Sequence, residues 1–224
     1  MAKAPLIFDI DETEFLPTFK TYITANQSVQ IFIGSAGSGK SVFLYKRAMA
    51  MALGLPYFRM LFARKVKDTI RDSVFLGFKD TIREWGLQEY FNVKEGSMDI
   101  TCNLNGNMLL SFGMDDPEKL KSVKDISHVL FEEFSDSEQG DFAELQRRLR
   151  TDKVAKTQFW GALNPVAGWW GRQYFFKDPE ADEIPNGLVE ASTEDTLILK
   201  TTYHTNPHID QVSYRKKNEE LAAL

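Results

Sequence analysis

The first half of the chain alternates short apolar runs with amphipathic stretches. Val29–Gly34 is a short run of β-forming residues, residues 40–53 have helical character, and residues 58–64 form a second apolar run. Apolar side chains then recur every four residues across 66–82, which predicts one long helix. The pattern therefore predicts two strands, each followed by a helix.

The middle of the chain has a different period. Apolar residues alternate with polar ones over residues 98–104 and again over 108–112. Asn105 and Gly106 lie between the two stretches, and Asn-Gly in this position is the strongest short signal for a tight turn. We therefore predict an antiparallel β-hairpin here.

Two later apolar runs, residues 127–131 and 157–163, predict buried strands. Between them, Ser135 and Glu138 have the spacing of a capping box, which predicts a helix that runs to about Arg150. Strands that alternate with helices favour a parallel sheet. The predicted fold is therefore α/β, with a mainly parallel central sheet flanked by helices and an added antiparallel hairpin.

Composition narrows the class of protein. The 224 residues are enough for one substantial domain or two small ones, and 43% of them are hydrophobic. The net charge of −5 means that any nucleic-acid contact must come from local basic clusters. The single cysteine, Cys102, excludes an internal disulfide, and no apolar run approaches the length of a membrane span. We expect a soluble, cytosolic type of chain without a signal peptide.

The stretch GSAGSGKS, at the end of the first predicted strand, fits the pattern G-x-x-x-x-G-K-[ST]. A strand enters it and a helix leaves it, so its backbone N–H groups and the helix N-terminus can cradle phosphates. Lys40 would reach the β- and γ-phosphates of ATP, and Ser41 would coordinate Mg²⁺. The predicted ATP-binding residues here are Gly34, Ser35, Ala36, Gly37, Ser38, Gly39, Lys40 and Ser41.

A phosphate loop also needs a carboxylate at the end of a neighbouring strand to hold the metal. Glu132 and Glu133 follow the predicted strand 127–131, and at a strand's end both side chains can turn towards the phosphates. We assign Glu132 to the metal and Glu133 to polarising the attacking water. The alternative register places Glu133 on the metal and Asp136 as the base.

The paired acids also indicate the class of phosphate-loop protein. No N-K-x-D sequence for guanine is present, and small-molecule kinases usually lack the second acid. By analogy of fold, the pair favours the RecA-like (ASCE-type) ATPases, in which a glutamate activates water.

Four further stretches go beyond a generic ATPase. They are LFARKVKDTIRDSVF (61–75), FGMDDPEKLKS (112–122), LNPVAGWW (163–170) and YHTNPHID (203–210). Together and in this order, from about residue 15 onward, they make the chain similar to the large terminase subunits of tailed double-stranded-DNA bacteriophages. The resemblance is nearest to the PBSX-type branch.

The resemblance implies an N-terminal ATPase domain that drives double-stranded DNA into a preformed capsid. In the family a separate nuclease domain follows, so we expect this chain to be the ATPase domain alone, without nuclease activity. It also implies portal-protein and small-subunit partners, and a homo-oligomeric ring on the procapsid, with a monomer in isolation as the alternative. The implied location is the host cytoplasm, at the portal, with no membrane contact.

The resemblance assigns further roles by position. Asn164 matches the family's coupling residue, which senses the γ-phosphate, although Ala162 stands where the family often has serine or threonine. We expect the nucleotide base to pack on the lead-in, where Phe19, Tyr22 and Gln27 precede the first strand.

One departure affects catalysis. The family commonly has arginine where this chain has Ala36, so the charge that stabilises the transition state must come from elsewhere. We predict that it comes in trans from the helix after the acidic pair, with the end of the second strand as the other candidate. The residues concerned are Arg147, Arg148 and Arg150 for the helix, and Arg64 and Lys65 for the strand.

The predicted organisation is a lead-in (1–28) that contributes to the nucleotide pocket, an ATPase core (29–205) and a C-terminal helix (206–224) that starts a linker. We expect Asn206 to cap this helix, with Pro207 at its first position. Two other functions stay open from the residues alone. One is a RecA-like helicase or translocase outside packaging, and the other is a nucleotide-gated assembly module with little hydrolysis.

Overall fold

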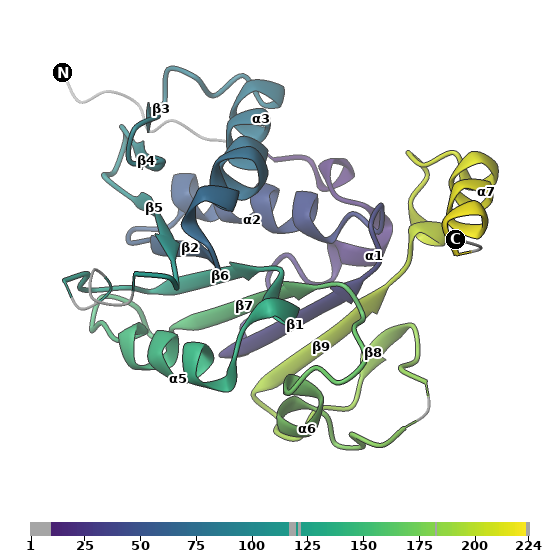
Figure 1. Ribbon diagram of the computed structural model, residues 1–224. Coiled ribbons are helices and arrows are strands. Elements are labelled where there is room, and N and C mark those ends of the chain that lie inside the picture. The colour runs from purple at the N-terminus through teal and green to yellow at the C-terminus, as the bar shows by residue number, and fades with distance from the viewer. Residues whose placement is uncertain (1–9, 117–119, 121, 182, 223–224) are drawn as a thin grey trace, which may run out of the picture.

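The computed structural model describes residues 10–116, 120, 122–181 and 183–222. Within these residues a nine-stranded sheet has the order β3-β4-β5-β2-β6-β7-β1-β9-β8 (Figure 1). The strands are β1 (Val29–Gly34), β2 (Arg59–Arg64), β3 (Phe91–Lys94), β4 (Asp99–Cys102), β5 (Met108–Gly113), β6 (His128–Glu132), β7 (Gln158–Leu163), β8 (Gly187–Val189) and β9 (Thr196–Thr201).

Six neighbouring strands, from β5 to β9 in the sheet order, run parallel, and β3, β4 and β8 pair antiparallel at the two edges. The predicted α/β fold with a mainly parallel sheet and an antiparallel hairpin is therefore confirmed. Strand β7 lies between β1 and β6, as in RecA-like sheets. The sequence patterns missed β3, β8 and β9, which are short or lie near an edge.

Helices cover both faces of the sheet. In Figure 1, α1, α2 and α3 lie on one face, and α5 and α6 lie on the other. The helices are α1 (Pro17–Lys20), α2 (Lys40–Gly54), α3 (Leu76–Glu84), α5 (Gln139–Arg148), α6 (Gly171–Phe175) and α7 (Gln211–Ala222). None of the helices among the described residues combines the length and the apolar character needed to cross a membrane.

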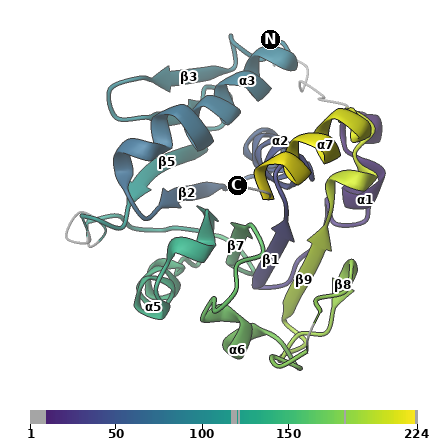
Figure 2. The same cartoon turned by 45° about the vertical axis from the view of Figure 1, so that its right-hand side comes forward.

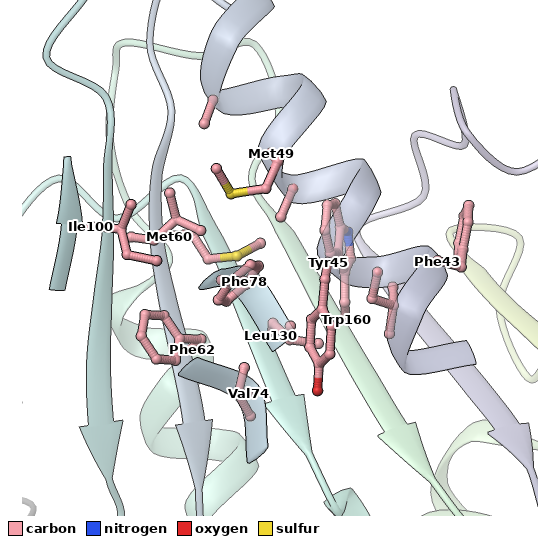
Figure 3. Packing of buried hydrophobic residues seen from close by; sticks show 14 of the residues in the cluster. Phe43, Tyr45, Met49, Met60, Phe62, Val74, Phe78, Ile100, Leu130 and Trp160 are labelled. Atoms are coloured by element: carbon pink, nitrogen blue, oxygen red, sulfur yellow. The ribbon is translucent and has the colours of Figure 1, made fainter. Parts of the chain in front are cut away.

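Each face of the sheet has its own apolar core. On the α2 face, the helix packs against alternate side chains of the strands, among them Phe62 and Trp160 (Figure 3). On the α5 face, Phe134 is at the centre of an aromatic cluster that includes Phe142 and Trp169. Because both faces are buried, the central strands read as nearly continuous apolar runs.

The long helix predicted over 66–82 is wrong in detail. Short 3₁₀ and π turns, Lys67–Ile70 and Arg71–Phe75, precede α3, and Val66 lies outside them with 45% of its surface exposed. Apolar side chains spaced strictly four apart drift about 40° per step around an α-helix. The wider π turn takes up part of this drift, so the later members of the stripe stay buried.

Two predicted helix starts are also wrong. The capping box of α5 is formed by Glu138 and Asp141, and Ser135 lies instead in a 3₁₀ turn that buries Phe134. Helix α7 begins after Asp210, whose carboxylate accepts hydrogen bonds from the backbone N–H groups of the first turn. Asn206 serves a different purpose, described below.

Candidate nucleotide-binding site

The phosphate loop connects β1 to α2 and has the backbone shape that its glycines permit. A Cβ at Gly34 would lie 2.5 Å from Ser38 Oγ and 2.7 Å from Thr201 Oγ1, so a side chain does not fit there. Gly37 and Gly39 have φ angles of 77° and 85°, in the left-handed region that favours glycine. The glycines of the motif therefore permit the backbone shape of the loop.

The C-terminal part of the chain holds this loop from outside. Asn206 Nδ2 donates to the carbonyl of Gly37, and the Tyr214 hydroxyl donates to the carbonyl of Ala36, both at 2.7 Å. Figure 2 shows α7 beyond the carboxyl end of β1, where the loop begins. These two bonds fix the orientation of two peptide planes in the loop.

The loop borders a cavity of about 440 Å³. The carboxyl ends of β2, β6 and β7 bring Arg64, the acidic pair and Asn164 to its other walls. Lys40 Nζ lies 3.0 Å from Asn164 Oδ1. Burial lowers the pKa of Lys40, and the charges of the two glutamates act against that shift. The predicted phosphate, metal, water and coupling residues thus share one cleft.

Both members of the acidic pair reach this cleft. Glu132 ends β6, is mostly buried, and accepts a hydrogen bond from the Tyr45 hydroxyl of α2. Successive strand residues point to opposite faces, but Glu133 leaves the strand with φ 54° and ψ 47°. This left-handed turn brings the Glu133 carboxylate into the same cleft. Asp136, the alternative base, is exposed and does not line the cavity.

Arg64 is the arginine that the fold brings to the cavity. It is buried, forms an ion pair with Glu133, and has its Nε 4.0 Å from Glu132 Oε2. Its Nη1 donates hydrogen bonds to the Thr69 carbonyl at 3.1 Å and the Ser73 hydroxyl at 3.2 Å. The guanidinium therefore links the acidic pair to the irregular turns before α3.

The other predicted basic residues lie away from the cavity of their own chain. Helix α5 runs back from the carboxyl edge of the sheet, so its last turn, with Arg147 and Arg148, lies at the opposite edge, where both pair with Glu144. Arg150 is exposed just beyond this helix. Lys65 pairs with residues at the start of α5. None of these side chains lines the cavity of its own chain.

Tyr22 is also away from the loop. It lines a separate hollow against β8 and β9, because the lead-in turns back along the sheet after α1. A different hollow of about 280 Å³ adjoins the loop. Lead-in residues form one wall of it, and its lining includes Leu16, Phe19, Val42 and His208.

Several residues of the site were not found from the sequence. Thr201 lies against Gly34, and Asn206 and Tyr214 hold the loop carbonyls. Ser73 and Ile209 line the cavity. The sequence signals for this group were the stretch 61–75, which contains Ser73, and the stretch 203–210, which contains Asn206 and Ile209. Both stood out by resemblance, and neither carried a predicted contact with the loop.

The fold and the cleft define a phosphate-loop nucleotide-binding protein of the RecA-like class. The family model for the phage terminase large subunit, Terminase_3, matches residues 26–222. The match covers most of the chain, and the chain therefore belongs to the phage terminase large subunit family. The expected resemblance is confirmed.

Two curated relatives are consistent with this family. The chain is 32% identical over 195 residues to the PBSX phage terminase large subunit of Bacillus subtilis (strain 168), which covers 85% of this chain and 44% of that protein. It is 27% identical over 110 residues to the large terminase subunit of Bacillus phage SPP1, covering 49% of this chain and 26% of that protein. The chain thus spans less than half the length of these relatives.

Solved structures show the same fold. The large terminase of a thermophilic bacteriophage, in complex with ADP, superposes with a TM-score of 0.69 at 15% identity, over 91% of this chain and 49% of that one. The large terminase ATPase domain of Thermus phage P74-26 superposes with a TM-score of 0.59 at 13% identity, over 86% and 87% of the two chains.

Proposed function

We propose that this chain is the ATPase domain of a viral DNA-packaging motor, which hydrolyses Mg-ATP to move double-stranded DNA into a procapsid. The observation that carries the proposal is that the phosphate loop and the acidic pair face one cleft. Lys40 and Asn164 line the same cleft and hydrogen-bond to each other. The family membership of the chain and the ADP bound to the large terminase of the thermophilic bacteriophage support it.

The groups of the cleft suit hydrolysis. The loop N–H groups and Lys40 bind the phosphates, and Glu133 accepts a hydrogen bond from the attacking water and orients it. Asn164, at the end of β7, contacts Lys40 and would respond when the γ-phosphate leaves. Arg64 brings a positive charge to the cavity wall, which makes it the candidate within the same chain for the charge missing at Ala36, beside the arginines proposed to act in trans.

The cleft also suits magnesium. Ser41 provides a hydroxyl oxygen and Glu132 a carboxylate oxygen, which are the hard donors that Mg²⁺ takes at phosphate sites. Both residues line the cavity, and Tyr45, one helical turn after Ser41 on α2, hydrogen-bonds to Glu132. Bound Mg²⁺ would neutralise charge on the β- and γ-phosphates.

We infer that the nucleotide base occupies the 280 Å³ hollow next to the loop. The hollow shares Gly39 and Val42 with the phosphate cavity, so one nucleotide can span both. Phe19 and Phe43, which are buried with their rings stacked 4.6 Å apart, lie behind its apolar side. This placement replaces Tyr22 as the base contact and keeps the lead-in in the nucleotide pocket.

The finer features of the motor are proposals that rest on family membership. They are a ring of copies at the portal of the procapsid, contact with the small terminase subunit and double-stranded DNA, and a location in the host cytoplasm. ATP turnover that rises with blunt double-stranded DNA supports packaging, whereas strand separation on a forked duplex favours a helicase.

Two substitutions test the site. Lys40→Ala should weaken ATP binding on the order of 100-fold or more, because the loop loses its charged hydrogen bonds to the phosphates. Glu133→Gln should leave binding intact and lower the turnover number by about 10²–10⁴-fold, because the amide is a poor base. Binding is measured with a fluorescent ATP analogue and turnover by phosphate release.

Glu190→Gln is the matched control, since Glu190 is an exposed glutamate that pairs with Lys177 on the surface. Unchanged turnover in Glu133→Gln would refute the assignment of the water activator. Tight ATP binding with negligible turnover in the unaltered chain would favour the second candidate, a nucleotide-gated assembly module. The observation that favours this second candidate is Ala36, which leaves the loop without the arginine that the family commonly has there.

A further inference from the structure

Tyr45 stands between the two side chains to which we assign magnesium. It lies four residues after Ser41 on α2, so both side chains share one face of the helix. Its hydroxyl donates a hydrogen bond to Glu132 Oε1. A tyrosine at this position was not singled out by any sequence pattern.

The ring of Tyr45 has little freedom to move. Only 7% of the residue is exposed, and the Phe78 ring packs against it with centroids 5.1 Å apart. Gly77 makes room for it, because a Cβ at that position would overlap the Tyr45 ring. In Figure 3 the ring lies in the core with its hydroxyl towards the arrowhead ends of the strands. The core therefore holds the hydroxyl at a fixed point in the cleft.

Glu132 has a competing partner. Arg64 Nε lies 4.0 Å from Glu132 Oε2, and the same guanidinium already pairs with Glu133. A carboxylate released from the phenol would be drawn towards this cation. The hydroxyl of Tyr45 opposes that movement by occupying Oε1.

We propose that Tyr45 is a positioning residue for the metal: it fixes the Glu132 carboxylate beside Ser41 and keeps it from turning to Arg64. This inference rests on the proposed function, since it concerns the magnesium of the same ATP site. Partners that orient a metal's carboxylates typically change metal affinity about 10–100-fold when removed. The Tyr45 hydroxyl has the position such a partner needs.

The test is Tyr45→Phe, which keeps the ring and removes only the hydroxyl. Mn²⁺ replaces Mg²⁺, and free Mn²⁺ is measured by electron paramagnetic resonance in the presence of the non-hydrolysable analogue AMP-PNP. We expect Mn²⁺ affinity to fall about 10–100-fold. AMP-PNP affinity in EDTA should be unchanged, because the loop and base contacts remain. Tyr174→Phe, a half-exposed tyrosine on α6, is the matched control.

The possible outcomes distinguish a failure of the proposed Tyr45 role from a failure of the proposed ATP site. Mn²⁺ affinity within twofold of the unaltered chain would overturn the role of Tyr45 and leave the ATP site standing. Absence of Mn²⁺–AMP-PNP binding by the unaltered chain would overturn both proposals. Should Tyr45→Phe not fold, Gly77→Ala takes its place, since the added Cβ displaces the ring. A loss of fivefold or more supports the proposal, and unchanged affinity contradicts it.

Discussion

At the scale of single residues, Glu133 shows how the site depends on backbone strain. A left-handed conformation costs a residue with a side chain about 1–3 kcal/mol, and such strain is commonly found at functional sites. At Glu133 the strain turns the second carboxylate into the cleft, next to Arg64. The contrast is Met98, which also has a positive φ but lies in the turn between β3 and β4.

His128 is a buried titratable residue at the start of β6. Its ring lies 4.7 Å from the ring of Phe58 and 5.6 Å from that of Trp160. Burial, and to a smaller extent the charge of Arg47, lowers the pKa of His128 from 6.5 to about 3. The folded protein therefore keeps this imidazole neutral at a pH where the unfolded chain protonates it.

A pH-dependent loss of stability follows from His128. Between pH 6.5 and about 3 the unfolded chain binds a proton that the folded chain does not, so the free energy of unfolding falls as the pH falls. The loss attributable to this residue reaches roughly 5 kcal/mol at the low-pH limit. His128→Met should flatten the slope of unfolding free energy against pH between about 6.5 and 4. Urea titrations at several pH values measure it.

The control for this prediction is His204→Met, at an exposed histidine after β9. It should keep the slope of the unaltered protein. Parallel slopes in His128→Met and the unaltered protein would show that His128 is protonated in the folded state.

At the scale of elements, the segment between β9 and α7 braces the phosphate loop. Its bonds from Asn206 and Tyr214 go to loop carbonyls, and Ile209 packs 3.3 Å from where a Cβ of Gly37 would be. The loop is therefore preorganised by contacts from outside its own helix and strand. Because the loop is already ordered, less conformational entropy is lost when a nucleotide binds.

Removing this brace should weaken nucleotide binding. Each neutral hydrogen bond contributes about 1 kcal/mol, so we expect the double variant Asn206→Ala, Tyr214→Phe to bind ATP roughly 5–30-fold more weakly. Tyr57→Phe is the matched control, because its hydroxyl also donates to a backbone carbonyl at 2.7 Å, that of Asp125, away from the loop. Equal ATP affinity in the double variant and the control, measured by calorimetry, would contradict the bracing role.

At the scale of the whole molecule, the sheet separates the nucleotide cleft from the arginines predicted to act in trans. Arg147, Arg148 and Arg150 lie at or beyond the end of α5, at the amino edge of the sheet, and the phosphate loop lies at the carboxyl edge. They remain candidates only for the site of a neighbouring copy. Head-to-tail contact in a ring can bring one edge of a copy to the opposite edge of the next.

The trans role predicts how turnover depends on protein concentration. Turnover per chain should rise with concentration, and the triple alanine variant at these arginines should lose the rise while keeping the rate of the dilute protein. Phosphate release across a dilution series measures both. Fast turnover that stays first-order in protein on dilution would leave Arg64 as the source of the missing charge.

Local patterns in the sequence determined the parts of the site that consist of neighbouring residues. The loop from Gly34 to Ser41 and the acidic pair after β6 were predicted because glycine conformations, strand ends and helix starts are local properties. The parallel strands β1, β2, β6 and β7 were predicted for the same reason, because both faces are buried and their residues are almost continuously apolar, whereas the parallel strand β9 was missed.

Only the tertiary structure decided which distant side chains complete the cleft. Arg64 meets Glu133, Tyr45 meets Glu132 across 87 positions, and Asn206 meets Gly37 across 169. Such contacts depend on strand order and on where a helix returns, and no short pattern records either. The residues that would bind phosphate, metal and water can therefore be recognised from short stretches of the sequence. The side chains that orient them come from distant positions and are brought there by the fold.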